Sequence, residues 1–411
     1  MVSSRTLLKI TLVIAAIIIS STLIATTPVE AKSQSVQWTY QGSSATVSGY
    51  PWLSPTGDLF VYSINGANAT VNAVSPQGKG LWNTDLALER KLQFSSVDGS
   101  IFAQVTVLSN TQVNGSGVLA LSSAGVIKWN YTIPGNATGM RVLPDGGVVI
   151  GTEPKFPGQH SLICLNANGS ERWTKGNYSA SSPNSETYPV AILGNDVLVA
   201  NISLSSLNRS VITEYTPDGV VFRSFQTAFV PQSNIFFAPD GSMRLLGTTT
   251  TSGEYLYALN ANGSLMWAFP VSSVYGDLAI FPDGTTAFGE LSSSTTVNLQ
   301  VFAVDNHGKM LWRSSNIKTI PVAFGNGVLL ANSTGLMLVD RDGGVIWKLA
   351  GSFNGQPAVN GKTIYAGSGS VLMAISESAW KVTWQPVVLV LTILVAMLGV
   401  GVLSGISPKI D

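Results

Sequence analysis

Cysteine, histidine and charged residues are scarce in this chain of 411 residues. The single cysteine, Cys164, excludes an intrachain disulfide framework. The two histidines, His160 and His307, are expected in solvated loops, and neither has a second histidine at ligand spacing, so no zinc site is predicted. Lys and Arg number 22, as do Asp and Glu, and the charged fraction is 11%. This balance favours no nucleic acid partner, and so few carboxylates predict a stability that changes little in acid.

Recognisable catalytic motifs are missing as well. No nucleophile with a nearby base and no phosphate-binding glycine loop stands out. Residues 340–343 and 166–169 contain parts of a calcium loop, but each lacks the full ligand set and the distal Glu, so Asx turns are the better interpretation. We therefore assign no catalytic, cofactor-binding or metal-binding residue. Acidic residues outside the turn motifs, which could line a central channel, are Glu186, Asp277 and Glu290.

A ten-residue motif, ALNANGSLMW at residues 258–267, recurs through most of the chain. Its two alternating arms around an Asn-x-x-Gly centre predict a β-hairpin with a Trp on the second arm. Copies that keep both Gly and Trp end at Trp82, Trp129, Trp173, Trp267, Trp312 and Trp347, and a degenerate copy has Arg223 instead. From Trp82 the spacings are 47, 44, 50, 44, 45 and 35 residues, which indicates blades of about four strands. Cys164 replaces an Ala of four other copies and is expected to be a small buried residue.

A second motif, a turn followed by an alternating strand, occurs eight times, beginning with SPTGDLFVYSI at residues 54–64. Trp38 stands in an outer strand with no hairpin before it, and the last unit, residues 362–376, ends without an outer strand. If the N-terminal strand joins the C-terminal blade, the ring closes with eight blades and no exposed seam. A competing closure would use residues 379–384 as the last outer strand.

The motif Ala-x-Asn/Asp-x-x-Gly-x-x-x-Trp, with a period in the forties, resembles the repeat of pyrroloquinoline-quinone-type β-propellers over residues 32–377. The resemblance implies an all-β, eight-bladed propeller of four-stranded antiparallel blades in which each Trp packs between neighbouring blades. The structural Trp set is then Trp38, Trp82, Trp129, Trp173, Trp267, Trp312 and Trp347. The repeat occurs both in quinoprotein dehydrogenases and in cofactor-free binding propellers, so it does not name a function. A dehydrogenase of this type would need a catalytic Asp, a calcium-binding Glu and Asn, and often an adjacent Cys pair, which the lone Cys164 cannot form.

Both ends of the chain carry uncharged stretches. Residues 1–31 read as a secretory signal, with an uncleaved anchor as the alternative. Residues 386–406 contain no charge and are long enough to cross a bilayer as a helix. Residues 378–385 then form a juxtamembrane segment and residues 407–411 a cytoplasmic tail, which predicts a single-pass protein of the cell membrane with its propeller outside.

The sequence contains ten Asn-x-Ser/Thr sequons, which matter because the chain is predicted to be exported. They are candidate N-glycosylation sites if the source cell glycosylates exported proteins, with the turn residues Asn168 and Asn262 as the best acceptors. The sequons are Asn68, Asn114, Asn130, Asn136, Asn168, Asn177, Asn201, Asn208, Asn262 and Asn332.

The anchor together with the missing chemistry favours a cell-surface propeller that binds a protein or glycan partner without catalysis and without a cofactor. Two alternatives remain open. One is a structural component of the cell envelope, and the other is an exported quinoprotein oxidoreductase whose site residues have drifted from the family pattern.

Overall fold

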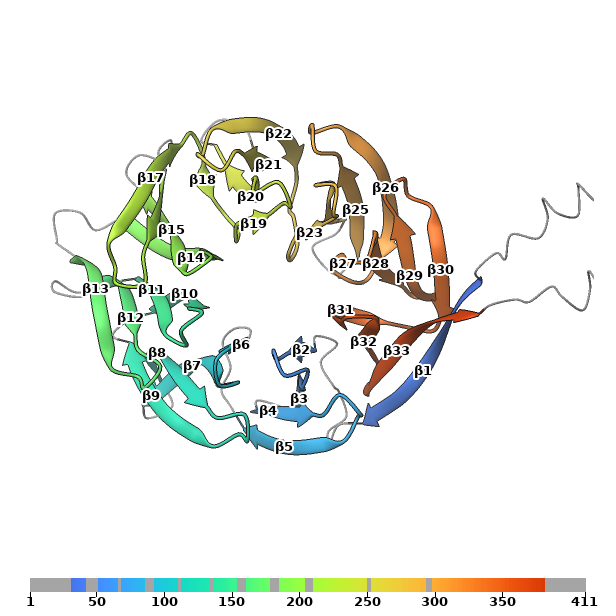
Figure 1. The fold of residues 1–411 in the computed structure, drawn as a ribbon, viewed down its shortest axis with the longest axis horizontal. Helices are drawn as coiled ribbons and strands as arrows, with labels where there is room; N and C mark the ends of the chain where they lie inside the picture. Colours follow the sequence, from blue (N-terminus) through green and yellow to red (C-terminus); the bar gives the residue numbers. More distant parts are fainter. Residues whose placement is uncertain are drawn as a thin grey trace, which may run out of the picture. The chain divides into compact units, whose positions relative to one another are not determined.

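The computed structural model is all-β, and its sheets follow one another around a ring (Figure 1). Contacts divide the chain into the unit Val36–Ser376, which contains the ring, and a second unit made of the chain ends, Met1–Ser35 with Glu377–Asp411. Eight separate sheets confirm the eight-bladed propeller predicted from the repeats. The structure describes residues 31–41, 51–65, 68–85, 92–109, 112–133, 136–153, 160–177, 185–203, 210–249, 253–292 and 298–380.

Blades 1 to 4 are each built from four strands that are consecutive in the sequence. Blade 1 contains β2 (Trp52–Leu53), β3 (Leu59–Asn65), β4 (Asn68–Val74) and β5 (Gly80–Asp85). Blade 2 contains β6 (Gln93–Phe94), β7 (Ile101–Ser109), β8 (Gln112–Leu121) and β9 (Ile127–Ile133). Blade 3 contains β10 (Asn136–Val142), β11 (Val148–Glu153), β12 (His160–Leu165) and β13 (Glu171–Asn177). Blade 4 contains β14 (Ser185–Leu193), β15 (Asp196–Ser203), β16 (Ser210–Tyr215) and β17 (Val221–Thr227).

Blades 6 and 7 continue this order, and blade 8 combines both ends of the ring. Blade 5 contains β18 (Val230–Pro231), β19 (Phe236–Phe237), β20 (Met243–Thr248), β21 (Glu254–Leu259) and β22 (Leu265–Val271). It departs from the predicted four strands, because β18 and β19 both pair with β20. Blade 6 contains β23 (Ala279–Ile280), β24 (Thr286–Leu291), β25 (Leu299–Val304) and β26 (Met310–Ile317). Blade 7 contains β27 (Val322–Phe324), β28 (Gly327–Asn332), β29 (Gly335–Asp340) and β30 (Val345–Ala350). Blade 8 contains β31 (Asn354–Asn360), β32 (Thr363–Ser368), β33 (Val371–Trp380) and β1 (Ala31–Gln41).

Each blade is an antiparallel meander, so the turn between its first and second strands lies at the same end as the turn between its third and fourth. In blade 1 these turns are residues 54–58 and 75–79, both closed by main-chain hydrogen bonds. They are neighbours in space, because a Cβ placed on Gly57 would lie 3.5 Å from Cγ of Pro76. We call the end of the ring that carries these two sets of turns the hairpin end.

The repeat Trp residues join each blade to the next at the hairpin end, as the resemblance implied. Trp38 shows the arrangement: its Nε1 donates to the carbonyl of Pro76 at 2.8 Å. Gly78 in the same turn has φ +82°, and a Cβ there would lie 2.6 Å from the Trp38 ring, so the turn needs Gly both for its backbone and for this close approach. The same bond, between 2.7 and 2.9 Å, is donated by Trp82, Trp129, Trp173, Trp267 and Trp312.

The hydrophobic core is divided among the blade interfaces. Eight clusters of buried apolar side chains are present, and each combines residues of two neighbouring blades. Cys164 is fully buried in the cluster between blades 3 and 4, where burial raises the thiol pKa to about 12. Its expected role as a small core residue is confirmed.

The seam of the ring lies in blade 8, where β1 pairs beside β33. Trp38 from β1 packs against Tyr365 of the same blade, with ring centroids 5.9 Å apart. Ser376 pairs with Thr363, directly after the turn at residues 360–362. The predicted closure by the N-terminal strand is therefore confirmed, and Val36 and Ser376 both lie at the hairpin end.

Several expectations fall outside the described residues. These are residues 1–30 of the signal predicted at residues 1–31, the apolar segment 386–406 and the tail 407–411. Of the juxtamembrane segment predicted at residues 378–385, residues 378–380 belong to β33 instead, and the others lie outside the described residues. In the part of the chain that the structure describes, no helix has the length and apolar character needed to cross a membrane. One local expectation was wrong: His160 is the first residue of β12 instead of a loop residue, because the strand pairing with Asn177 includes it.

Candidate functional site

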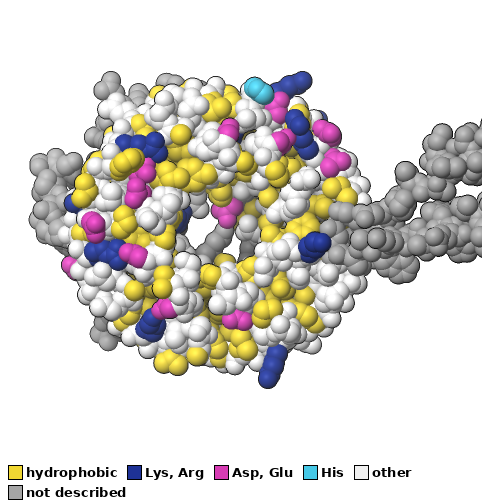
Figure 2. Space-filling view, in the orientation of Figure 1, with side chains coloured by type: hydrophobic (Ala, Val, Ile, Leu, Met, Phe, Trp, Pro, Cys, Tyr) yellow, Lys and Arg dark blue, Asp and Glu magenta, His cyan; other side chains and the backbone are white. Residues whose placement is uncertain are grey.

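The central channel opens at the hairpin end through a mouth lined by apolar side chains. In each blade the last or the penultimate residue of the innermost strand is an apolar residue that precedes the first turn and is half-buried. Seen along the ring axis, the molecule is hollowed at its centre (Figure 2). The eight residues, one from each blade in order, are Leu53, Phe94, Val142, Ile192, Phe237, Ile280, Ala323 and Val359, and we call them the collar.

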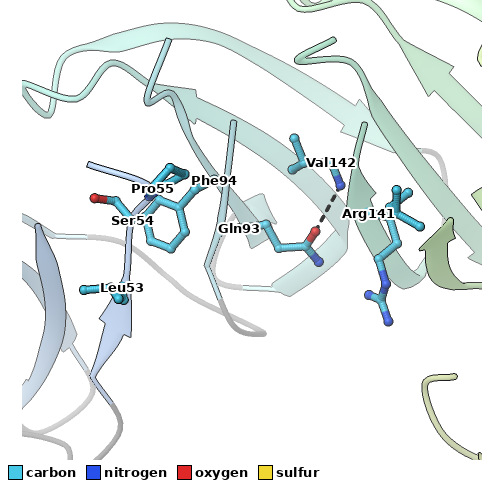
Figure 3. Close-up of a pocket in the computed structure, with 8 residues that line it drawn as sticks. Leu53, Ser54, Pro55, Gln93, Phe94, Arg141 and Val142 are labelled. Carbon is cyan, nitrogen blue, oxygen red and sulfur yellow. Dashed lines mark hydrogen bonds between the residues drawn. The ribbon is translucent and has the colours of Figure 1, made fainter. Parts of the chain in front are cut away.

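Two cavities lie along the collar. The first, of about 430 Å³, spans blades 1 to 4 and is lined by four collar residues together with Ser54, Pro55, Gln93 and Arg141 (Figure 3). The second, of about 410 Å³, spans blades 5 to 7 and is lined by three collar residues with Phe281, Phe324 and the turn prolines. Both cavities are of the size of small-ligand or side-chain pockets, and their lining is mainly apolar.

Arg141 is the charged residue of the first cavity, and it connects three blades. Its Nη1 donates to the carbonyl of Met140 at 2.7 Å, and its Nη2 donates to the carbonyl of Val190 at 3.1 Å and to Oδ1 of Asn234. Burial lowers the pKa of the guanidinium, and the charge of Asp277 opposes that shift. Arg141 stays protonated, because even a lowered Arg pKa lies far above neutral pH.

Gln93 holds the free edge of β10 beside Arg141. Its Oε1 accepts from the main-chain N–H of Val142 at 3.1 Å (Figure 3). Its Nε2 donates to the carbonyl of Met140. The side-chain amide therefore replaces a neighbouring strand for this stretch of backbone. An inner strand edge that would otherwise be open to the channel is satisfied from within the protein.

Further polar contacts connect blades 3, 4 and 5 along the channel wall. Thr138 Oγ1 donates to the carbonyl of Thr187 at 2.6 Å. The main-chain N–H of Ile235 donates to the carbonyl of Val190 at 3.2 Å, which also receives Arg141. Side chains fixed in this way form a preorganised mouth, with apolar surface for contact and one cation for orientation. This arrangement can bind a partner, and among the described residues around the mouth no nucleophile lies beside a base.

The acidic residues predicted to line the channel do not share one position in the structure. Asp277 precedes the inner strand β23, and its charge opposes the lowering of the Arg141 pKa; its place along the channel stays a prediction. Glu290 lies near the end of β24 and accepts from the N–H of Ser272 at 3.0 Å, away from the collar. The side chain of Glu186 lies outside the described residues. Arg141, Gln93 and the collar were not predicted from the sequence, although the apolar residue before every first turn is a signal of the collar.

The stretches that contain parts of a calcium loop are turns. Oδ1 of Asp340 accepts from the N–H groups of Asp342 and Gly344 at 2.9 and 2.7 Å, and Oδ1 of Asn168 accepts from Ser170 N at 3.0 Å. These oxygens stabilise the turns as Asx caps, as predicted. His307 lies in a turn of the same kind, where its N–H donates to Asp305.

The ten sequon residues are spread over the ring. Asn168 and Asn262 are in hairpin-end turns, and the Oδ1 of each accepts from a Ser two residues later. Asn130 is exposed on β9, whereas Asn201 is half-buried. Asn136 and Asn332 lie at the opposite end of the ring, at the start of β10 and the end of β28. Asn208 and the side chains of Asn68, Asn114 and Asn177 lie outside the described residues.

The described residues do not fit a calcium-bound quinone. Among them no group of three or more His, Cys, Asp or Glu side chains is gathered where it could hold a metal ion. Cys164 is buried between blades 3 and 4, so its thiol does not face a cofactor in the channel.

The fold and the channel define an eight-bladed β-propeller of the pyrroloquinoline-quinone-like type. The comparisons agree, since residues 298–399 match the family described as outer membrane protein assembly factor BamB. BamB from Moraxella catarrhalis is similar in structure, with a TM-score of 0.52 and 14% identity over 84% of this chain and 100% of that chain. A europium-containing methanol dehydrogenase is also similar, with a TM-score of 0.51 and 13% identity over 84% of this chain and 93% of that chain. A comparison with curated protein sequences finds no match.

These likenesses establish the fold and leave the activity open. One similar structure is an assembly factor and the other is an enzyme, and at 13 to 14% identity neither transfers its role to this chain. The choice between binding and catalysis therefore rests on the site residues.

Proposed function

We propose that this chain is an exported propeller, anchored in the cell membrane by residues 386–406, that binds a protein or glycan partner without catalysis. The observation that carries the proposal is the collar. It provides one apolar side chain from every blade around the channel mouth, next to Arg141, which is already positioned by three acceptors. Preorganised apolar surface with few fixed polar groups is typical of binding sites.

A protein partner is favoured over a glycan by this lining. Sugar-binding sites need many polar groups aimed at hydroxyls, whereas the two cavities are lined mainly by aliphatic and aromatic side chains. The match to an assembly-factor family supports the same choice. A location of this chain in the cell envelope is supported by the match to that family and by the uncharged segments of the sequence.

Site-specific photocrosslinking in the source membrane tests the binding proposal. A photoreactive amino acid that replaces Phe94 of the collar should give one or a few discrete adducts. The yield of these adducts should fall when the same chain also carries Arg141→Ala. The matched control places the same group at Asn130, which is exposed on an outer strand and outside the collar. Equal adduct patterns at both positions would remove the collar as the binding site.

The enzyme alternative has its own measurement. Full-length protein is loaded with pyrroloquinoline quinone and calcium and assayed for dye-linked oxidation of alcohols and sugars. We expect no stoichiometric chromophore and no turnover above a heat-denatured control. A tightly bound quinone with turnover would overturn the non-catalytic proposal.

A further inference from the structure

Large hydrophobic side chains that are exposed in the described residues gather at one end of the ring. All but Val36 lie in a hairpin-end turn or on the first residues of the outer strand beside it, and Val36 lies in the outer strand β1, two residues before Trp38. Phe222 is the most exposed, at 67%. We call this set the apolar rim: Val36, Leu81, Val97, Val126, Ile127, Val220, Val221, Phe222, Leu265, Met266, Met310, Val345 and Ile346.

The outer strands change character away from this end. On β9 the exposed residues after Trp129 are Asn130 and Thr132, and on β17 those after Arg223 are Ser224 and Gln226. The same strands therefore present apolar side chains at the hairpin end and polar ones along the rest of their length. A surface that faces only water has no need of apolar side chains gathered at one end. An apolar band of this extent is typical of a contact surface.

The chain enters and leaves the propeller at the apolar rim. Val36 belongs to the rim, and Ser376 pairs with Thr363 beside the turn at residues 360–362. Only residues 377–385 separate Ser376 from the uncharged segment 386–406. Nine residues span at most about 30 Å when fully extended, so the chain can place the start of that segment no farther than this from Ser376.

Some charged groups at the hairpin end form ion pairs, while others there, such as Lys79, Asp218 and Lys362, are exposed. The ion pairs that the described residues form include Lys128 with Asp98 at 2.7 Å and Arg172 with Asp145 at 2.7 Å. The other two pairs, Arg223 with Glu214 and Arg341 with Asp283, also lie at this end. Pairing reduces the cost of moving these charges into an interfacial region of lower polarity than water.

We propose that the apolar rim rests on the surface of the lipid bilayer, with the hairpin end of the ring facing the membrane. This inference rests on the proposed anchor at residues 386–406. It gives the propeller an orientation, because the channel mouth then opens toward the bilayer. The partner of the collar must accordingly be a polypeptide presented from the membrane side.

Depth-dependent fluorescence quenching tests this orientation on the full-length chain. Cys164 is buried with a pKa raised to about 12, so an introduced surface cysteine is the one that reacts at neutral pH. Phe222→Cys places a fluorophore on the rim in blade 4, across the ring from the seam in blade 8. The matched control, Ser333→Cys, is exposed in the turn between β28 and β29 at the opposite end.

Both variants are reconstituted into phosphatidylcholine vesicles with and without lipid spin-labelled near the headgroup. We expect at least twofold stronger quenching at position 222 than at position 333. Vesicle flotation reports the anchor separately: a chain that does not float overturns the proposed anchoring and this inference with it. A chain that floats while position 222 is quenched no more than position 333 overturns this inference and leaves the anchor standing.

Discussion

Arg223 donates from Nη1 to the carbonyl of Ala261 at 2.6 Å, the bond that an indole N–H makes at six other blade interfaces. The ring contact of the missing Trp is supplied by Phe225, because a Cβ on Gly263 would lie 2.3 Å from that ring. Two residues thus share the roles that one Trp has elsewhere. Blade 4 therefore lacks the repeat Trp, but the contacts that hold blade 4 against blade 5 are kept.

Arg223→Ala should destabilise the protein by about 2 to 3 kcal/mol, since it removes a charged hydrogen bond to Ala261 and leaves Glu214, which is 5% exposed, without its partner. Chemical denaturation followed by tryptophan fluorescence measures the change. Arg313→Ala, an exposed position on β26, is the control and should stay within about 0.5 kcal/mol. Equal effects from both substitutions would refute the assigned role of Arg223.

Trp38→Ala should be among the most damaging substitutions, because it removes the indole from the interface between blades 8 and 1 together with its bond to Pro76. We expect a loss of about 3 to 5 kcal/mol in the free energy of unfolding. Trp384→Ala, in the segment outside the described residues, should have far less effect. Thermal melts of the two full-length variants in detergent distinguish them, and the reverse ranking would place the closure at the C-terminal end.

Trp347 differs from the other repeat Trp residues because its buried Nε1 has no hydrogen-bond partner among the described residues. The reason is the seam: β33 and β1 come from opposite ends of the chain, so blade 8 has no hairpin turn to offer a carbonyl. Trp347→Phe should therefore lose less stability than Trp129→Phe, which forfeits the bond to Ala167 worth about 0.5 to 1.5 kcal/mol. Denaturant midpoints of the two variants decide the matter, and a larger loss at position 347 would contradict this account.

Stability should depend on pH only in strong acid. The hydrogen bond from Lys128 holds the pKa of Asp98 well below its ordinary value, and the hydrogen bond from Ser242 lowers the pKa of Asp240. A folded-state pKa below the unfolded value gives stability that is present above the unfolded pKa and lost as the pH falls through the folded one. Melting temperatures should be flat from pH 7 to about pH 4 and should fall below it.

Substitution of Asp98 and Asp240 tests whether their carboxylates cause this pH dependence. Asp98→Asn combined with Asp240→Asn should lower the melting temperature at pH 7 and flatten the decline below about pH 4, since both titrating groups are gone. Asp342→Asn, at an exposed turn residue, is the control. An unchanged acid limb in the double variant would show that other groups are responsible.

Much of the fold was predictable because its signals are local. The turn sequences around Gly57 and Gly78 specify their own backbone, and the alternation on either side specifies the strands. The Trp at a fixed distance after each turn identified the outer strand, and the unpaired Trp38 identified the seam. His160 was misassigned because its strand extends into a Gly- and Pro-rich stretch, where pairing with Asn177 overrides local preference.

The candidate site was less predictable. Arg141 sits in a strand whose sequence, MRVLPDGG, resembles every other first strand, and nothing local marks it as a residue that reaches Val190 and Asn234. Those partners lie 49 and 93 residues away along the chain. Gln93 likewise appears as an ordinary polar residue until ring formation places it against the open edge of β10.

The sequence by itself determined that eight similar blades form, because each blade is a meander whose turns and strands lie within one repeat, and it determined which segment closes the ring. Only the tertiary structure decided what the ring does with residues far apart in the chain. Closing eight blades brings their first strands around one axis and aligns their outer hairpins at one end. Scattered residues such as Leu53 and Phe237 thereby become a collar, and Leu81, Phe222 and Ile346 become a rim.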